Sequence, residues 1–219
     1  MSFELWALLI DTRMSATLTL YLVRHGQTEY NATGRVQGWT DVPLDAIGLV
    51  QAERLAMRFS NKTLSAIYSS PLARAADTAY AIASTTNMPV ILDDRLREYN
   101  MGQWSGLTGD EILAVTPGMV HWDGPEREIP GGENARQMRD RVEAFLHDLV
   151  QKHTSGETVV AVSHGGTLGA VIAAMLGLPV LRRQPFTFGN TAITKVSYDH
   201  GQWRIRSLND RCHLRQGDE

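Results

Sequence analysis

Cysteine is almost absent from this chain, which has a single thiol, Cys212, among its 219 residues. One cysteine cannot build a disulfide framework or a cysteine-rich metal site. A reducing compartment, the cytoplasm, is therefore the expected location. Lysine is scarce as well, since it occurs only at Lys62, Lys152 and Lys195, and this scarcity indicates no particular function.

Long apolar runs and a strong excess of one charge are also missing. The apolar stretch at residues 5–10 is too short for a membrane span. Acidic Glu4 before it, and the lack of a small-residue cleavage site after it, argue against a signal peptide. The formal net charge of −3 argues against general binding to nucleic acid or anionic membranes. We therefore expect neither as a partner.

The rest of the composition is that of one folded domain. Apolar residues make up 43% and charged residues 21% of the chain, and no linker divides it. A chain of this length can bury one substantial core. We expect residues 17–219 to form a single domain after an N-terminal extension, residues 1–16, with Met14 as an alternative natural start.

Hydrophobic periodicity predicts an alternation of strands and helices. The predicted strands lie at 17–23, 66–69, 90–92 and 158–163, with a β-hairpin over 192–206. The predicted helices lie at 49–59, 71–86, 131–153 and 165–176. Ser70 is expected to cap the second helix, with Pro71 at its first position. This order predicts an α/β fold, a three-layer α/β/α sandwich with a mostly parallel central sheet.

Two of the predicted strands end in a histidine followed by glycine. Arg24 and His25 follow the first strand, and His164 follows the strand at 158–163. Ligands bind at the carboxyl ends of parallel strands, so the two histidines converge there if both strands lie in one sheet. A lone histidine at a strand end is more often structural, but the matched pair favours a binding site.

Arg74 adds a cation to this site. It falls in the first turn of a predicted helix, where the helix dipole disfavours a positive charge by about 0.3–1 kcal/mol. A cation kept there suggests a bound anion. Together with Arg24, His25 and His164 it would form a compact positive pocket that suits a phosphoryl group.

Such a pocket can transfer a phosphoryl group without a metal ion. A neutral imidazole can attack phosphorus through one nitrogen while a hydrogen bond fixes the other. The arginines would spread the charge of the equatorial oxygens. Glu98, in a loop rich in apolar residues, is the candidate acid for the leaving alkoxide. A salt bridge from Glu98 to Arg95 or Arg97 is the alternative role.

These motifs resemble the histidine phosphatase superfamily, the phosphoglycerate-mutase-like proteins. Residues 24–31, Arg-His-Gly-Gln-Thr-Glu-Tyr-Asn, look like the signature of that family. Further segments in the family's order lie at 37–44, 69–75, 96–98, 102–106 and 162–166. The resemblance covers about residues 17–214. It implies a phosphoglycerate mutase-like fold, on the branch with His-Gly after the late strand.

The resemblance also implies roles for individual residues. It implies His25 as the phosphorylated nucleophile and Glu98 as proton donor and later base, with no cofactor and no metal. Arg24, Arg74 and His164 would be catalytic as ligands of the transferred phosphate. The phosphate- and substrate-binding positions that it implies are Arg24, Asn31, Gln37, Gly38, Arg74, His164 and Gly165.

Other classes of protein fit the sequence less well. A metallohydrolase would need clustered ligands, but Asp41 and Asp45 have no histidine at ligand spacing. A serine hydrolase would need a Gly-x-Ser-x-Gly elbow, which the chain lacks. A non-catalytic binding protein on this fold would be expected to lose His25 or Glu98, and both are present.

Within the family, the choice lies between a mutase and a phosphatase. Similar mutases carry an insertion whose basic residues grip the substrate, but this chain has no Lys or Arg between Arg97 and Arg127. Apolar residues occur there instead, as core or as a substrate-facing wall: Met101, Trp104, Met119 and Trp122. This favours a phosphatase with a less acidic, partly apolar leaving group.

We therefore predict a phosphomonoesterase that hydrolyses a small phosphorylated metabolite through a phosphohistidine intermediate. The alternative is a cofactor-dependent phosphoglycerate mutase. By resemblance, the candidate substrates include sugar phosphates, glucosyl-phosphoglycerate, α-ribazole phosphate, phosphoserine and phosphorylated nucleosides. The oligomeric state is left open, with a homodimer among the choices.

Overall fold

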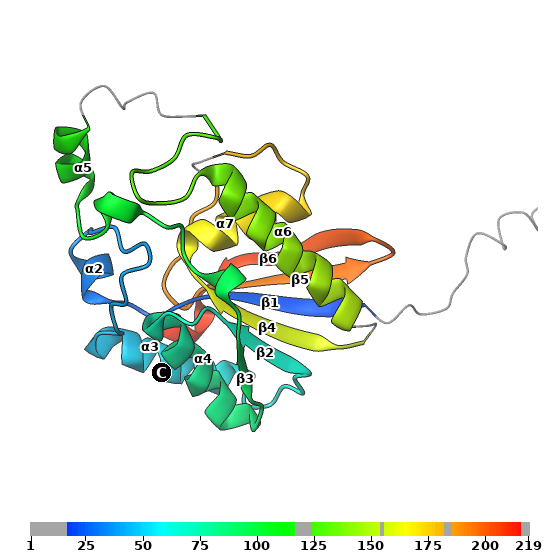
Figure 1. The fold of residues 1–219 in the computed structure, drawn as a ribbon. Helices are drawn as coiled ribbons and strands as arrows, with labels where there is room; N and C mark the ends of the chain where they lie inside the picture. The colour runs from blue at the N-terminus through cyan, green and yellow to red at the C-terminus, as the bar shows by residue number, and fades with distance from the viewer. Residues whose placement is uncertain (1–16, 117–123, 154–155, 182–184, 216–219) are drawn as a thin grey trace, which may run out of the picture.

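A computed structural model describes residues 17–116, 124–153, 156–181 and 185–215 (Figure 1). The expected N-terminal extension, residues 1–16, lies outside the described residues, as do Met119 and Trp122. No helix in the described ranges is long and apolar enough to cross a membrane.

A six-stranded sheet forms the middle layer, in the order β3-β2-β4-β1-β5-β6. The strands are β1 (Leu18–Arg24), β2 (Ala66–Ser69), β3 (Val90–Leu92), β4 (Thr158–Ser163), β5 (Ile193–Asp199) and β6 (Gln202–Asp210). β3, β2, β4 and β1 run parallel, whereas β5 and β6 form the predicted hairpin and pair antiparallel. The mostly parallel sheet is confirmed.

Helices cover both faces of this sheet (Figure 1). They are α3 (Ala46–Phe59) and α4 (Ala73–Thr86) on one face, and α6 (Ala135–Lys152) and α7 (Gly165–Met175) on the other. Because side chains alternate along a strand, β1 points Leu20 and Leu22 toward α6 and α7, and Val23 toward α3 and α4. The predicted three-layer sandwich is therefore confirmed.

The predicted start of α4 is wrong. The helix begins at Ala73, two residues after Pro71, and Ser70 does not cap it. The carboxylate of Asp41, from a loop far back in the chain, accepts a hydrogen bond from the Ala73 N–H at 2.7 Å. Arg74 nevertheless stays in the first turn of the helix, as expected.

Other helices begin at positions that differ from the predicted ones, because local capping residues determine where they start. α6 begins at Ala135 rather than at residue 131, because the side chains of Asn134 and Gln137 form a capping box. Two short helices within stretches not predicted to be helical, α2 (Glu29–Ala32) and α5 (Gly109–Val115), also begin at capping boxes. Short turns of 3₁₀ helix lie at Asp94–Leu96, Gly102–Trp104 and Cys212–Leu214.

Candidate active site

Two histidines meet at one end of the sheet. β1 and β4 are neighbouring parallel strands, so His25 after β1 and His164 after β4 emerge side by side. Their ring centroids lie 5.1 Å apart, with an interplanar angle of 58°. His25 is 2% exposed and His164 is fully buried. The convergence expected from the two strand ends is present.

The ring of His25 is held at one nitrogen. Its Nδ1 lies 2.6 Å from the carbonyl oxygen of Gly26, which can only accept a hydrogen bond, so Nδ1 carries the proton. Burial, and then the charges of Arg24 and Arg74, lower the pKa of His25 well below its ordinary value. The imidazole is therefore neutral at pH 7, and Nε2 carries a free lone pair.

The ring of His164 is held the other way round. Its Nε2 lies 2.8 Å from the hydroxyl of Ser70, which also accepts a hydrogen bond from the Leu72 N–H. Its Nδ1 is buried without a hydrogen-bond partner among the described residues. Burial, followed by nearby cations led by Arg74, lowers the pKa of His164 well below the ordinary value. If the Ser70 hydroxyl donates to Nε2, the neutral ring presents Nδ1–H as a donor.

Two arginines lie at the same end of the sheet. Arg74 is fully buried, and its terminal nitrogens donate to the carbonyls of Gly38 and Thr40, each at 2.8 Å. Gly38 has a φ of +53°, a left-handed conformation that favours glycine. Arg24 donates to the Phe188 carbonyl at 2.5 Å. Carbonyl oxygens hold both guanidinium groups without neutralising them.

The environment of the arginines is electrostatically unfavourable without an anion. Burial lowers the pKa of Arg74 to about 10, although Glu98 and Asp41 act in the opposite direction. Burial also lowers the pKa of Arg24. The Nε atoms of both arginines are buried and have no hydrogen-bond partner among the described residues. With His164 Nδ1 they make three buried nitrogens without a partner among the described residues, and each unsatisfied group costs about 1–3 kcal/mol.

Glu98 lies at the N-terminus of α7. Its Oε1 accepts hydrogen bonds from the N–H groups of Tyr99 at 2.8 Å and Thr167 at 3.1 Å, and from the Thr167 hydroxyl at 3.2 Å. Its Oε2 accepts a hydrogen bond from the Gly166 N–H at 3.1 Å. A Cβ on Gly166 would come within 2.6 Å of Oε1, so this approach requires glycine. Oε2 is the oxygen with more capacity for a proton or a further donor.

The salt bridge considered for Glu98 is not formed. Arg95 pairs with Asp93 and Asp148 instead, both at 2.7 Å. Arg97 pairs with Asp94 at 3.1 Å. The alternative role for Glu98 is therefore wrong.

The remaining predicted binding residues lie around this centre. Gln37 is buried, and its Oε1 has no partner among the described residues. Gly165 begins α7, and a Cβ placed on it would lie 3.7 Å from Arg24 Nε. Asn31 completes the capping box at the start of α2, and its Oδ1 accepts hydrogen bonds from the Thr28 N–H at 3.2 Å and from Asn190 Nδ2 at 3.1 Å. The same Asn190 amide donates to the backbone carbonyl of His25 at 3.2 Å.

Sequence reasoning missed several residues that shape the site. Ser70 appeared only as a helix cap, and Thr167 and Asn190 were not considered. Trp39 was also missed: its Nε1 donates to the Glu98 carbonyl at 2.7 Å, and it is 39% exposed. Residues 37–44 were part of the resemblance to the family, but the resemblance assigned no role to Trp39. Trp104, by contrast, lies in the hydrophobic core.

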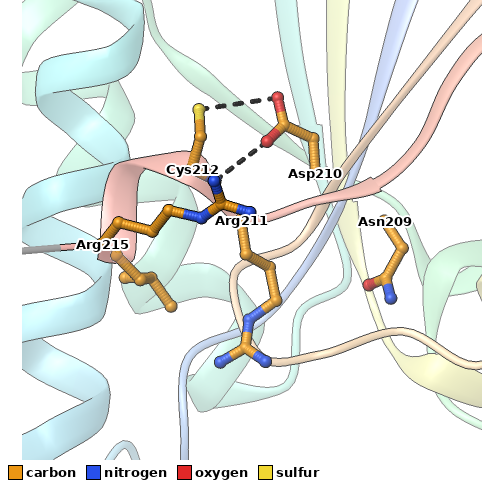
Figure 2. A pocket seen from close by; sticks show the side chains of 6 residues that line it. Asn209, Asp210, Arg211, Cys212 and Arg215 are labelled. Atoms are coloured by element: carbon orange, nitrogen blue, oxygen red, sulfur yellow. Dashed lines mark hydrogen bonds between the residues drawn. The ribbon is translucent and has the colours of Figure 1, made fainter.

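A separate cavity lies near the C-terminal end of the described chain (Figure 2). It has a volume of about 390 Å³ and contains none of the candidate site residues. Its lining residues are Asn209, Asp210, Arg211, Cys212, Leu214 and Arg215. Within the described ranges, no group of three or more His, Cys, Asp or Glu side chains is arranged to hold a metal ion.

Comparisons with known proteins bear on this arrangement. A profile described as Histidine phosphatase superfamily (branch 1) matches residues 20–211. The chain is 42% identical over 169 residues to glucosyl-3-phosphoglycerate phosphatase of Mycolicibacterium vanbaalenii, covering 74% of this chain and 75% of that protein. It is 36% identical over 208 residues to a Yersinia pestis protein named "Probable phosphoglycerate mutase GpmB", covering 90% of this chain and 95% of that protein.

The fold is similar to that of a solved relative. The native structure of mycobacterial glucosyl-3-phosphoglycerate phosphatase superposes with a TM-score of 0.81 at 34% identity. The match covers 89% of this chain and 100% of that chain.

Proposed function

This chain belongs to the histidine phosphatase superfamily, branch 1, and we propose that it hydrolyses phosphate monoesters of small metabolites through a phosphohistidine intermediate. One observation carries the proposal. Three buried nitrogens on Arg24, Arg74 and His164 have no partner among the described residues, and these three residues lie close enough to His25 to affect its charge or contact its ring. A phosphate group would satisfy these donors and balance the two guanidinium charges.

The first half of the reaction forms the intermediate. His25 Nε2 donates its lone pair to phosphorus, and the bond from phosphorus to the ester oxygen breaks. Glu98, in its protonated form, gives its proton to that oxygen, and the alcohol leaves. Arg24, Arg74 and the His164 Nδ1–H hold the equatorial oxygens while charge develops on them.

The second half releases phosphate. Glu98, now a carboxylate, takes a proton from a water molecule, and the water oxygen bonds to phosphorus. The bond from phosphorus to His25 Nε2 breaks and restores the neutral ring. Inorganic phosphate leaves, and Glu98 is protonated again for the next turnover. The fixed charges of the arginines fill the role that metal ions play in other phosphoryl-transfer sites, so the proposed reaction is metal-independent.

The alternative activity is that of a phosphoglycerate mutase, the activity named for the Yersinia pestis relative. A mutase needs a cation for the substrate carboxylate. Basic side chains outside the interval from Arg97 to Arg127 that are candidates for that role are Arg35, Arg182 and Arg183. Arg35 pairs with Glu111 of α5 at 3.0 Å and donates to the Gly106 carbonyl, whereas residues 182–184 lie outside the described residues. Hydrolysis is therefore the activity that we favour.

Further parts of the proposal rest on the sequence. Residues 17–219 would form the catalytic domain, without a nucleic-acid or membrane partner. The single cysteine supports a location in the cytoplasm. A homodimer is an open proposal that size-exclusion chromatography with light scattering would test.

The proposed function is tested by a screen for phosphate release. The purified chain is incubated with a panel of sugar phosphates, glucosyl-3-phosphoglycerate, phosphoserine and nucleoside monophosphates, with His25→Ala as the matched control. We expect release from at least one alkyl phosphate by the unaltered chain and none by His25→Ala. Release that is equal in both proteins, or absent throughout, would reject the proposal.

A further inference from the structure

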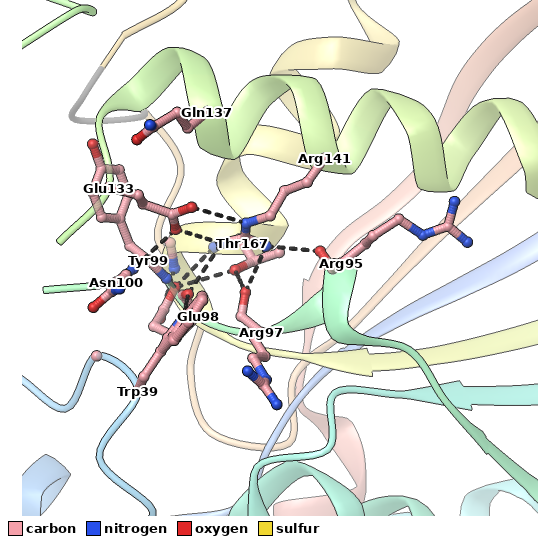
Figure 3. Close-up of polar contacts among 12 residues, drawn as sticks. Trp39, Arg95, Arg97, Glu98, Tyr99, Asn100, Glu133, Gln137, Arg141 and Thr167 are labelled. Carbon is pink, nitrogen blue, oxygen red and sulfur yellow. Dashed lines mark hydrogen bonds and ion pairs between the residues drawn. The ribbon is translucent and has the colours of Figure 1, made fainter.

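Arg141 of α6 binds the backbone of the loop that carries Glu98 (Figure 3). Arg141 Nη1 donates to the carbonyl oxygens of Arg95 at 2.7 Å and Arg97 at 2.8 Å. Its Nη2 donates to the carbonyl of Glu98 at 3.0 Å. One guanidinium group therefore binds three of the four carbonyls between residues 95 and 98.

Arg141 is itself held in place by an acidic partner. Its Nη2 lies 2.7 Å from Glu133 Oε1, and its Nε lies 3.1 Å from Glu133 Oε2. Glu133 Oε1 also accepts a hydrogen bond from the Asn100 N–H at 2.9 Å. The side chains of Arg141 and Glu133 are only 15% and 11% exposed. This two-point pair fixes the plane of the guanidinium group and ties down the far end of the loop.

The loop has little regular structure, and side-chain contacts hold it, among them that of Arg95 with Asp148 of α6. It contains the 3₁₀ turns Asp94–Leu96 and Gly102–Trp104, with Glu98 between them. A second donor, Trp39 Nε1, binds the same Glu98 carbonyl at 2.7 Å. Trp39 stands between Gly38 and Thr40, whose carbonyls bind Arg74. The Glu98 peptide is thus the point where α6 meets the segment that holds the phosphate-binding arginine.

We propose that Arg141, oriented by Glu133, is the positioning residue for the general acid Glu98. The proposal rests on the proposed function. Proton transfer needs the acid within about 2.6–3.2 Å of the ester oxygen, and a displacement of about 1 Å can lower the rate by about 10². Arg141 touches no reacting atom. It acts by fixing the backbone from which the Glu98 side chain reaches the leaving group.

The test compares two leaving groups. Arg141→Met removes every donor at similar length, and it should lower kcat on glycerol phosphate, whose alkoxide needs a proton, by about 10- to 100-fold. Its kcat on p-nitrophenyl phosphate, whose phenolate needs little protonation, should fall by less than about 3-fold. Arg139→Met is the matched control on the same helix, because Arg139 binds Glu143 and the Leu178 carbonyl and not the loop. It should leave both rates unchanged.

A double variant separates positioning from general damage. In a Glu98→Gln background, Arg141→Met should lower the rate on glycerol phosphate no further, because the acid is already lost. Equal losses on the two substrates, or a further loss in the Glu98→Gln background, would overturn the inference. If Arg141→Met does not fold, Glu133→Gln is measured in its place and must show the same leaving-group pattern. Failure of the proposed function is distinct, because the unaltered chain would then release phosphate from neither substrate.

Discussion

The rings of His25 and His164 lie with centroids 5.1 Å apart and an interplanar angle of 58°, and each ring is held by a hydrogen bond at a different nitrogen. His25 has its Nδ1 bound to the Gly26 carbonyl, which leaves Nε2 as a nucleophile. His164 has its Nε2 bound to Ser70, and its Nδ1 is a donor when the Ser70 hydroxyl donates to Nε2. Two identical side chains at matched strand ends thus acquire different chemistry from the one hydrogen bond that each makes.

His25→Ala should abolish turnover, because no other side chain at the site can carry the phosphoryl group in its place. Rapid quenching of the unaltered chain with ³²P-labelled substrate, without acid, should trap phosphate on Nε2 of His25. Peptide mapping by mass spectrometry identifies the position. His147→Ala, which changes an exposed histidine of α6, is the control and should keep normal activity. Phosphate trapped on any other residue would contradict the assignment.

Both histidines should make stability depend on pH in the weakly acidic range. Burial and nearby arginines place their folded-state pKa well below the unfolded value of 6.5. The unfolded chain therefore binds these protons more readily, so stability that is present above about pH 6.5 is lost as the pH falls. Urea unfolding at pH 8, 6.5 and 5.5 measures this loss. His164→Gln should show a smaller loss than the unaltered chain, and an equal loss would count against a buried neutral ring.

Much of this site was predictable because it lies at the ends of buried strands. Continuous apolar runs mark parallel strands covered on both faces, and β1 and β4 showed such runs directly before His25 and His164. Placing two such ends in one sheet is enough to bring the histidines together. Predicting Arg74 in the first turn required only the approximate start of α4. The wrong assignment of Ser70 and Pro71 therefore did not affect the prediction for Arg74.

The contacts made across the fold were not predictable. Asp41 caps α4 from 32 residues away, and no local pattern marks it as a cap. Arg95 is a plausible partner for Glu98 by closeness in sequence, yet it forms ion pairs with Asp93 and Asp148. Thr167 reaches Glu98 only because α7 begins beside the loop. Local propensity cannot choose among acceptors that tertiary packing brings within reach.

Glu98→Gln should slow the release of poor leaving groups. The amide keeps the size of the side chain but removes the transferable proton, so kcat on glycerol phosphate should fall by about 10²–10⁴. The rate on p-nitrophenyl phosphate should fall much less. The ratio of the two rates is the measured quantity. Equal losses on both substrates would mean that Glu98 only anchors the N-terminus of α7.

Chelators should leave the activity unchanged. Arg24 and Arg74 supply fixed positive charge that other phosphoryl-transfer sites obtain from metal ions. The chain is dialysed against EDTA, and kcat is then measured with and without added Mg²⁺, Mn²⁺ or Zn²⁺. The same kcat is expected in every case. A loss on dialysis that one of these ions restores would overturn the metal-independent mechanism.

The last prediction is that this chain hydrolyses phosphate esters far faster than it interconverts 2- and 3-phosphoglycerate. A mutase must keep water away from its phosphorylated intermediate until the substrate reorients. This requires side chains that bind the part of the substrate that does not react. A cation for the carboxylate would contribute about 1.5–3 kcal/mol, or about ten- to a hundred-fold. The sequence from Glu98 to Glu126 contains no Lys or Arg. Arg35, a candidate from elsewhere in the described chain, is paired with Glu111.

The comparison is made in one set of incubations. 3-Phosphoglycerate is supplied with and without 2,3-bisphosphoglycerate, and 2-phosphoglycerate is followed by an enolase-coupled assay. Free phosphate is followed in parallel on the same enzyme with the substrate panel. We expect phosphate release on the best panel substrate to exceed isomerisation by about 10- to 100-fold, the difference that one missing charge-assisted contact produces. Isomerisation that is stimulated by the bisphosphate and is faster than phosphate release from every substrate would identify a mutase. Arg182→Ala and Arg183→Ala would then show which cation binds the carboxylate.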